Sequence, residues 1–80
     1  MTAPLVLRFL AEEGNEYVRS LLLEELAQPS GGAKYLTFNV FNVNLDFEAQ
    51  LATVEDELDP DAVETLSLSD FRGLLEQRST

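Results

Sequence analysis

Tyr35–Leu58 reads YLTFNVFNVNLDFEAQLATVEDEL, and apolar residues alternate with polar ones along most of it. The apolar side chains occupy even positions in 36–40, odd positions in 41–47 and even positions again in 52–58. Successive side chains of a strand point to opposite faces of a sheet, so each change of parity marks a turn or a bulge. The stretch therefore predicts strands that pair antiparallel.

The second change of parity predicts a hairpin. Its loop is expected to be Glu48–Leu51, because Ala49-Gln50 lacks the asparagine or glycine that a two-residue turn requires. The expected pairs are Phe47 with Ala52, Leu45 with Val54, Val43 with Asp56 and Phe41 with Leu58. The first change, at Val40-Phe41, predicts a bulge or a strand that passes from one layer to another.

In this register one face of the hairpin is apolar and the other is polar. The polar face carries Asn42, Asn44, Asp46, Thr53, Glu55 and Glu57, with no basic residue among them. The stretch therefore predicts an acidic, amide-rich sheet surface.

The residues before the hairpin predict one or two helices. Pro4–Glu13 has Thr2 as a cap and Gly14 as a stop, although a short buried strand over Leu5–Leu10 fits nearly as well. A second helix is expected from Asn15, its cap, through Gln28.

The second helix has an apolar stripe that should face the core. The stripe is Val18, Leu21, Leu22 and Leu26, at spacings of three and four. Leu23 lies off the stripe, so it either widens the buried face or contacts another chain. Arg19 lies on the face expected to be solvated, and Pro29 stops the helix.

The residues after the hairpin predict a turn, a strand and a helix. Asp59-Pro60-Asp61 reads as a turn or a one-turn helix, and Thr65–Ser69 as a short strand. Ser67 and Asp70 form a capping box for the final helix, although a start one or two residues later, capped by Ser69, also fits. Gly73 inside that helix costs roughly 1 kcal/mol relative to alanine, which predicts a close packing contact there.

These elements predict a single α+β domain over residues 1–80. Its two layers are an antiparallel hairpin or meander and the N-terminal and C-terminal helices packed on the apolar face. Eighty residues leave no room for a second domain. The hydrophobic fraction of 45% is that of an ordinary folded domain.

The composition is strongly acidic. Fifteen Asp and Glu residues against five Lys and Arg residues give a formal net charge of -10, beyond the magnitude of roughly 2 to 8 that suits a small soluble domain. Such a field repels nucleic acid and anionic membranes and attracts basic surfaces. We therefore expect a basic protein partner, and neither direct nucleic-acid binding nor membrane binding.

The residue types limit the chemistry. The chain has no cysteine and no histidine, which excludes thiolate and imidazole ligands for zinc, copper or haem. General acid-base work would fall to carboxylates or to the lone Lys34. The carboxylates between Glu55 and Glu64 lack the glycine and the alternation of an EF-hand loop. We therefore expect no enzyme, no cofactor and no metal.

The sequence also bears on location. Residues 1–10 lack the charged start of a signal peptide, and their apolar run is interrupted by Arg8. No apolar run approaches the roughly 20 residues that span a bilayer. Together with the absence of cysteine, these features indicate a soluble, cytoplasmic protein.

The expected partner-binding surface combines the polar hairpin face with the acidic residues that follow it. It comprises Asp46, Glu48, Glu55, Asp56, Glu57, Asp59, Asp61 and Glu64, with Tyr35 or Leu51 as an apolar anchor. Such a surface could mimic nucleic acid and occupy a basic groove built for phosphates. The alternatives are a solvated outer face without a partner, and a structural or assembly subunit that forms a homodimer.

The same region resembles two groups of small inhibitors. Its runs are Leu-Asp-Phe-Glu around Phe47, Leu-Ala-Thr-Val-Glu-Asp-Glu-Leu, and Leu-Ser-Leu-Ser-Asp-Phe-Arg-Gly-Leu-Leu ending at Leu75. These runs resemble the acidic hairpin and closing helix of small bacterial toxin-immunity proteins. Phage-encoded inhibitors of bacterial defence, anti-CRISPR proteins included, are similar in size and acidity. Both resemblances imply a stoichiometric inhibitor that covers a basic nucleic-acid-binding or active-site surface of its target.

Overall fold

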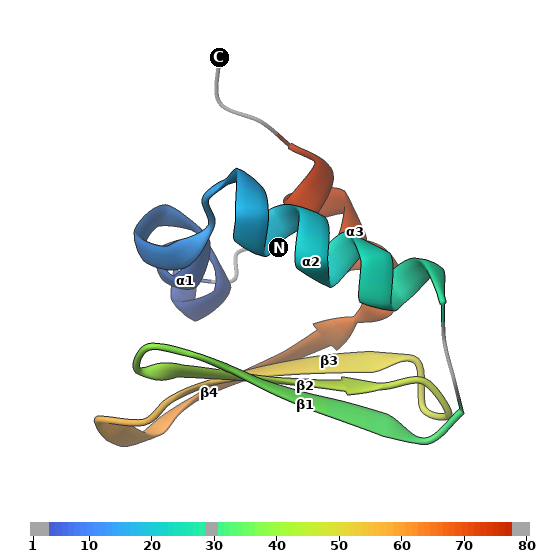
Figure 1. The fold of residues 1–80 in the computed structure, drawn as a ribbon. Coiled ribbons are helices and arrows are strands. Elements are labelled where there is room, and N and C mark those ends of the chain that lie inside the picture. The colour runs from blue at the N-terminus through green and yellow to red at the C-terminus, as the bar shows by residue number, and fades with distance from the viewer. Residues whose placement is uncertain (1–3, 29–30, 78–80) are drawn as a thin grey trace.

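A computed structural model describes residues 4–28 and 31–77, and Figure 1 shows their arrangement. The described residues form α1 (Pro4–Glu13), α2 (Glu16–Ala27), β1 (Ala33–Phe38), β2 (Phe41–Asp46), β3 (Leu51–Asp56), β4 (Asp59–Ser67) and α3 (Leu68–Glu76). The helices lie against one face of the sheet, and no described residue covers the other face (Figure 1). The predicted two-layer α+β fold is confirmed.

The sheet is an antiparallel meander in the order β1-β2-β3-β4. Between β2 and β3, Phe41 faces Asp56 and Val43 faces Val54. The predicted register, in which Phe41 faces Leu58, is wrong by two residues. A shift of two keeps every side chain on the same face of the sheet. The predicted division of β2 and β3 into an apolar and a polar face is therefore right.

The first change of parity is a two-residue turn, Asn39-Val40, between β1 and β2. Asn39 has a φ of 58°, and asparagine is one of the few residues besides glycine that tolerate this left-handed region. The expected bulge or change of layer at Val40-Phe41 is therefore wrong. Leu36 and Phe38 belong to a separate edge strand of the same sheet.

The loop between β2 and β3 is Phe47–Gln50, one residue earlier than the expected Glu48–Leu51. Oδ1 of Asp46 accepts hydrogen bonds from the backbone N–H groups of Glu48 (3.1 Å) and Ala49 (3.0 Å). These bonds fix the start of the loop at the end of β2. The residues that flank the loop are Asp46 and Leu51 instead of the predicted Phe47 and Ala52. Each strand therefore meets the loop one residue earlier than predicted, and each residue of β2 faces a partner two positions earlier in β3.

The fourth strand is longer than predicted. The expected turn at Asp59-Pro60-Asp61 is the first part of β4, and the turn before it is Glu57-Leu58. Pro60 is tolerated because β4 is an edge strand, where a missing N–H leaves no partner unpaired. The strand expected over Thr65–Ser69 is the end of β4, which stops at Ser67.

The helices form where they are predicted, and the alternative strand over Leu5–Leu10 is wrong. Asn15 caps α2, because its Oδ1 accepts the Val18 N–H at 2.9 Å. Ser67 caps α3 in the same way, because its Oγ accepts the Asp70 N–H at 3.0 Å. Side-chain oxygens at these positions satisfy N–H groups that have no partner within the helix.

The remaining helix predictions concern Leu23, Thr2 and Pro29. Leu23 packs against the core, so it widens the buried face of α2. The expected cap Thr2 and the expected stop Pro29 lie outside the described residues. No helix within residues 4–28 and 31–77 has the length and the apolar run that crossing a membrane requires.

The core lies between the sheet and the helix layer. Phe9 of α1 is fully buried, and its ring centre lies 5.7 Å from that of Phe38 and 5.4 Å from that of Phe41. The other buried apolar residues are Leu5, Val6, Leu10, Val18, Leu22, Val43, Leu45, Phe47, Ala52, Val54, Leu68, Phe71 and Leu75. Leu58 does not face Phe41 but lies 78% exposed in the turn before β4.

Two glycines of the helix layer are expected to respond in opposite ways to alanine. A Cβ atom at Gly14 would overlap the carbonyl oxygen of Leu10 and lie 2.8 Å from its Cα. Gly14→Ala is therefore expected to lower the free energy of unfolding by about 1 to 3 kcal/mol. A Cβ at Gly73 meets nothing within 4 Å, so the close packing predicted there is wrong.

Gly73→Ala is accordingly expected to raise the free energy of unfolding by about 1 kcal/mol, because alanine restricts the unfolded chain more than glycine does. Urea unfolding of both variants measures the two changes side by side. A Gly73→Ala variant less stable than the parent would contradict the open surroundings of Gly73.

Candidate functional site

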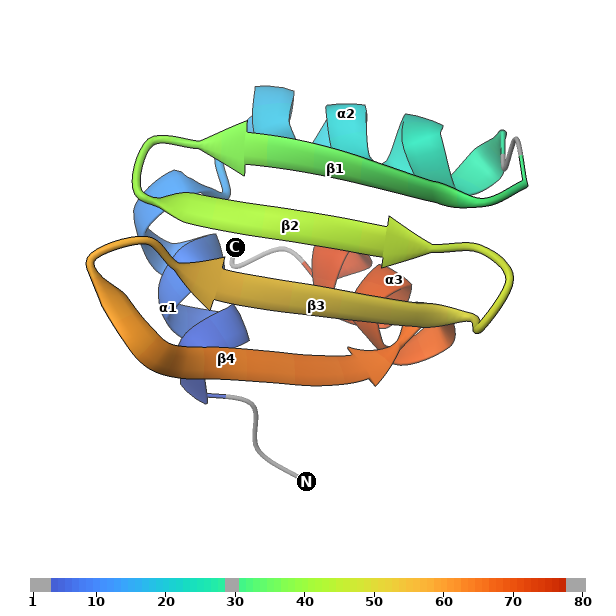
Figure 2. The same cartoon turned by 90° about the horizontal axis from the view of Figure 1, so that it is seen from below.

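The outer face of the sheet, turned away from the helices, carries part of the predicted site (Figure 2). Three rows of residues cross it from β1 to β4: Ala33, Asp46, Leu51 and Ser67; Tyr35, Asn44, Thr53 and Thr65; and Thr37, Asn42, Glu55 and Val63. The carboxylates of these rows are Asp46 and Glu55, and the rows contain no basic residue. The surface is thus polar at its centre and negative in charge.

Cross-strand hydrogen bonds order this outer face. The hydroxyl of Thr37 donates to Oδ1 of Asn42 at 2.9 Å. The hydroxyl oxygens of Thr53 and Thr65 lie 3.1 Å apart and share a second hydrogen bond. Neighbouring side chains on paired strands support each other in this way. A partner would therefore meet a polar surface whose side chains are already held in place.

The acidic tip comprises Glu55, Glu57, Asp59 and Asp61, at the end of the sheet where β3 turns into β4. The last three are exposed, and Leu58 among them is 78% exposed. Oδ1 of Asp59 accepts the Asp61 N–H at 3.2 Å, which orders the start of β4. Of the ion pairs formed within residues 4–28 and 31–77, none involves a carboxylate of the tip. The tip therefore concentrates negative charge around an exposed leucine.

Tyr35 reaches the acidic tip across the outer face. Its hydroxyl donates to Oε1 of Glu55 at 3.3 Å, and the side chain remains 60% exposed. The loss of water around the hydroxyl, followed by the nearby carboxylates of Glu55 and Glu57, raises the pKa of Tyr35 above its ordinary value. A tyrosine hydroxyl is protonated at neutral pH even at its ordinary pKa, and the single O–H of Tyr35 is donated to Glu55. The structure brings the predicted aromatic anchor and the tip carboxylates together.

Asp46 and Glu48 lie at the opposite end of the sheet from the acidic tip. They flank the loop between β2 and β3, whereas Glu57 begins the turn between β3 and β4. Residues of one face repeat roughly every 6.5 to 7 Å along a strand, so the two row steps between Asp46 and Glu55 span about 13 Å. The predicted acidic residues thus form two groups rather than one continuous cluster.

Asp56 faces the helix layer, and only 9% of it is exposed. Its Oδ2 pairs with the guanidinium of Arg8 in α1, and its Oδ1 accepts the Leu58 N–H at 2.9 Å. The same guanidinium lies 5.2 Å from the centre of the Phe41 ring, a cation-π arrangement. The carboxylate of Asp56 therefore joins α1 to the sheet.

Glu64 also faces the helix layer. Its Oε1 accepts the Val6 N–H at 2.9 Å, in the first turn of α1, where backbone N–H groups have no partner inside the helix. A carboxylate at a helix N-terminus is also favoured by the helix dipole. Glu64 thus caps α1 from β4, and neither Glu64 nor Asp56 lies on the outer face. Among the described residues, no three carboxylates are placed to hold a metal ion.

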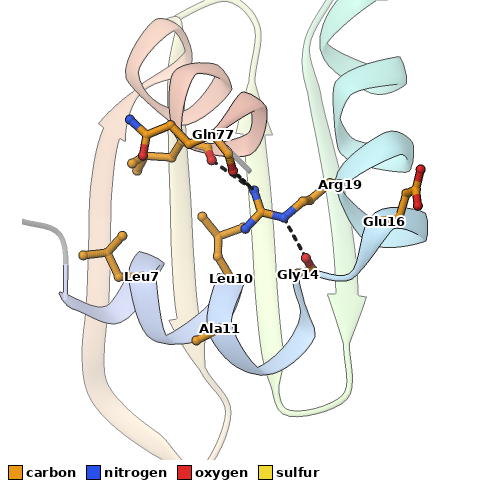
Figure 3. Close-up of a pocket in the computed structure, with 8 residues that line it drawn as sticks. Leu7, Leu10, Ala11, Gly14, Glu16, Arg19 and Gln77 are labelled. Atoms are coloured by element: carbon orange, nitrogen blue, oxygen red, sulfur yellow. Dashed lines mark hydrogen bonds between the residues drawn. The ribbon is translucent and has the colours of Figure 1, made fainter. Parts of the chain in front are cut away.

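An open pocket of about 650 Å³ lies on the helix side, between α1, the start of α2 and the end of α3 (Figure 3). It is lined by Leu7, Leu10, Ala11, Gly14, Glu16, Arg19, Leu74 and Gln77. The guanidinium of Arg19 points between the ends of α1 and α3 (Figure 3). Apolar side chains of α1 and α3 and the polar side chains of Glu16, Arg19 and Gln77 therefore share the lining of the pocket.

Arg19 binds backbone carbonyl groups rather than solvent. Its Nε donates to Gly14 at 2.7 Å, and its Nη1 donates to Leu74 (3.1 Å), Leu75 (3.0 Å) and Gln77 (2.9 Å). A cation at the C-terminal end of a helix stabilises the unpaired carbonyl groups there. The expected solvated side chain is therefore wrong, because Arg19 ties α2 to the ends of both other helices.

A sequence signal for this role exists. Neither α1 nor α3 carries a basic residue in its last turn, so each helix end gains from a cation supplied from elsewhere. The exposure of Leu58 has no such sequence signal, because Leu58 has an even number like the buried residues Ala52 and Val54 of the same stretch. Its exposure follows from the two-residue turn, which is set by the register of β3 and β4.

The acidic tip and the outer face share one chemical capacity. Exposed carboxylates accept hydrogen bonds from lysine and arginine side chains, and these charge-assisted bonds are among the stronger ones that proteins make. Leu58 and Tyr35 add apolar surface beside those carboxylates.

Comparison with protein-family models, with curated proteins and with solved structures finds no match to this chain.

Proposed function

We propose that this protein is a stoichiometric, non-enzymatic inhibitor that acts in the cytoplasm by binding a basic surface of a partner protein. The partner would be a nuclease, a toxin or a nucleic-acid-binding complex, as the likeness to immunity and anti-CRISPR proteins implies. The observation that carries the proposal is the acidic tip, whose four carboxylates form no ion pair with any described residue.

Charge and rigidity both favour such binding. The net charge of -10 would steer the protein toward a positive surface and speed association at low salt. The tip lies on a hairpin of paired strands, and the carboxylates of Glu55 and Asp59 already accept hydrogen bonds, which reduces the freedom that these two residues lose on binding. The bound tip would occupy a surface that otherwise takes phosphate groups.

An apolar contact would complete the interface. Leu58 is 78% exposed at the centre of the tip, and Tyr35 lies beside Glu55. Interfaces draw much of their affinity from a few buried apolar or aromatic side chains inside a polar rim. Leu58 and Tyr35 would supply the centre of the interface, and the carboxylates its rim.

The test compares two triple variants with the same net charge. The tip variant carries Glu55→Gln, Glu57→Gln and Asp59→Asn. The control variant carries Glu12→Gln, Glu24→Gln and Glu76→Gln, which neutralise three carboxylates of the helix layer. Each variant changes the net charge from -10 to -7, so only the place of the charge differs.

Each protein is immobilised and used to capture proteins from its host lysate at about 50 mM and about 500 mM salt, conditions that differ strongly in screening. We expect the parent and the control variant to retain the same basic protein at low salt, and the tip variant to lose it. Equal capture by all three proteins would contradict the proposal.

Self-assembly is a second candidate, and the outer face supplies the observation that favours it. Tyr35, Leu51 and Val63 expose apolar surface there, at 60%, 40% and 46% of their areas. A homodimer through this face would cover all three. Light scattering across a range of concentrations decides between the candidates, since a monomer at every concentration would exclude self-assembly.

A further inference from the structure

β1 is an edge strand, and the side turned away from β2 has no neighbouring strand among the described residues. A two-residue turn joins β1 to β2, so Phe38 and Phe41 on either side of it form a hydrogen-bonded pair. Such pairs alternate along an antiparallel ladder. The backbone N–H and C=O groups of Tyr35 and Thr37 therefore point away from β2, and within residues 4–28 and 31–77 they have no hydrogen-bond partner.

The opposite edge of the sheet is better protected. β4 carries Pro60 and the carboxylates of Asp59 and Asp61, and its register with β3 is irregular at Glu55. Proline, charge and irregular pairing are the features that keep an edge strand from accepting another strand. β1 pairs regularly over its whole length and has no proline, and its one charged residue, Lys34, is paired with Glu25 of α2. It is therefore the more receptive edge.

The helix layer adds side chains above this edge. α2 runs alongside β1 and extends past its free edge (Figure 2). Glu25 of α2 lies 3.8 Å from the ammonium of Lys34 in β1, which shows that this side of α2 faces β1. Tyr17 and Leu21 precede Glu25 at steps of four, so they lie on the same side.

Tyr17 and Leu21 both retain solvent-exposed side-chain surface. Tyr17 is 72% exposed, and Leu21 is half-buried without belonging to the residues packed on the core. A strand added to β1 would place alternate side chains under α2. Apolar side chains at those positions would contact Tyr17 and Leu21.

A second copy of this chain does not fit the edge. If two β1 strands paired antiparallel, about 4.8 Å would separate them. Because each α2 lies over its own β1 and extends past it, the two α2 helices would come at least as close (Figure 2). Packed helices need about 8 to 10 Å between their axes. The occupant must therefore be an extended segment with no helix of its own above it.

We propose that the free edge of β1 binds an extended segment of another protein as a fifth strand, and that this segment is cationic. The net charge of -10 makes a lysine- or arginine-containing segment the complementary partner. Main-chain hydrogen bonds to Tyr35 and Thr37 would give affinity, and contacts with Tyr17 and Leu21 would give preference for apolar residues between the basic ones. Only the positive charge of the segment rests on the proposed function.

The first test uses three capped synthetic peptides and the parent protein labelled with nitrogen-15. The peptides are alternating lysine and valine, the same sequence methylated at every backbone nitrogen, and alternating glutamate and valine. We expect the first to shift the Tyr35 and Thr37 amide signals saturably and to slow their hydrogen exchange. Methylation removes the main-chain donors at constant charge, so we expect at least about tenfold weaker binding.

The second test uses two proline variants matched in their surroundings. Thr37 and Thr65 both lie on the outer face of an edge strand, and each makes one side-chain hydrogen bond across strands. The N–H of each points away from the sheet, so proline at either position leaves the ladder intact. We expect Thr37→Pro to weaken binding of the lysine-valine peptide at least about tenfold, and Thr65→Pro to leave it unchanged.

The outcomes separate this proposal from the proposed function. Equal binding of the methylated and unmethylated peptides, equal loss in both proline variants, or no binding by the lysine-valine peptide would overturn strand addition, while the tip variant would still test the inhibitor role. Equal binding of the glutamate-valine peptide would overturn the cationic character of the segment. Because the peptide comparison uses the parent protein, it stands even where a proline variant fails to fold.

Discussion

Replacing Arg19 with methionine is expected to lower the free energy of unfolding by about 2 to 4 kcal/mol. The guanidinium donates to the carbonyl groups of Gly14, Leu74, Leu75 and Gln77, and hydrogen bonds to a charged group contribute about 1.5 to 3 kcal/mol each before exposure reduces them. Methionine keeps much of the aliphatic stem but leaves these carbonyl groups without their donor. Chemical unfolding in urea measures the change.

Arg72→Met is the matched control. Arg72 also pairs within the helix layer, but its partner Glu76 lies four residues away at 3.5 Å, and both side chains are more than half exposed. Exposed pairs of this kind contribute about 0.5 kcal/mol or less. Similar losses for Arg19→Met and Arg72→Met would contradict the bridging role of Arg19.

Phe9→Ala is expected to have the largest effect on stability, about 3 to 5 kcal/mol. Phe9 has no exposed surface, and its ring contacts those of Phe38 and Phe41 from the first hairpin. Its removal would leave a cavity where α1 meets the sheet. A domain of 80 residues has a total stability of roughly 4 to 12 kcal/mol, so the variant would be close to unfolding at room temperature.

Tyr17→Ala is the control for this aromatic deletion. Tyr17 is 72% exposed on α2, so its loss removes little buried area. A change within about 0.5 kcal/mol is expected for a surface position. Calorimetry of both variants gives the comparison, and a Phe9→Ala protein as stable as the Tyr17→Ala protein would contradict the placement of α1 on the sheet.

The pattern of apolar residues predicts the two faces of the sheet better than it predicts the pairing. Parity places Val43 and Val54 on the apolar face in both the predicted and the observed register. The loop decides between the registers, and Gln50 holds a φ of 62° there, a conformation that its side chain does not favour. Asp46 carries the usable signal, because a short carboxylate can accept hydrogen bonds from the N–H groups two and three residues on.

Local signals predict helix starts well, because a cap acts on its own neighbours. Asn15 and Ser67 cap their helices as predicted. The same local reasoning fails at Asp59-Pro60-Asp61, where pairing of β4 with β3 overrides the turn preference of the sequence. It fails at Arg19 because the carbonyl groups that Arg19 binds come from residues up to 58 positions away.

The same distinction between local signals and long-range contacts applies to the candidate site. Glu55, Glu57, Asp59 and Asp61 gather at one end of the sheet because they are close in sequence and share one turn. Whether a carboxylate faces the helices depends on tertiary structure. Asp56 meets Arg8 and Glu64 meets α1 only once the helix packs on the sheet.

The proposed function requires that the acidic tip forms the contact with a basic partner. The most direct measurement is the dissociation constant of the captured protein, purified and titrated against the parent, the tip variant and the control variant over a series of salt concentrations. We predict that the tip variant binds at least about tenfold more weakly than the parent at low salt and depends less on salt, whereas the control variant matches the parent. Tip and control variants with the same affinity and the same salt dependence would contradict the claim.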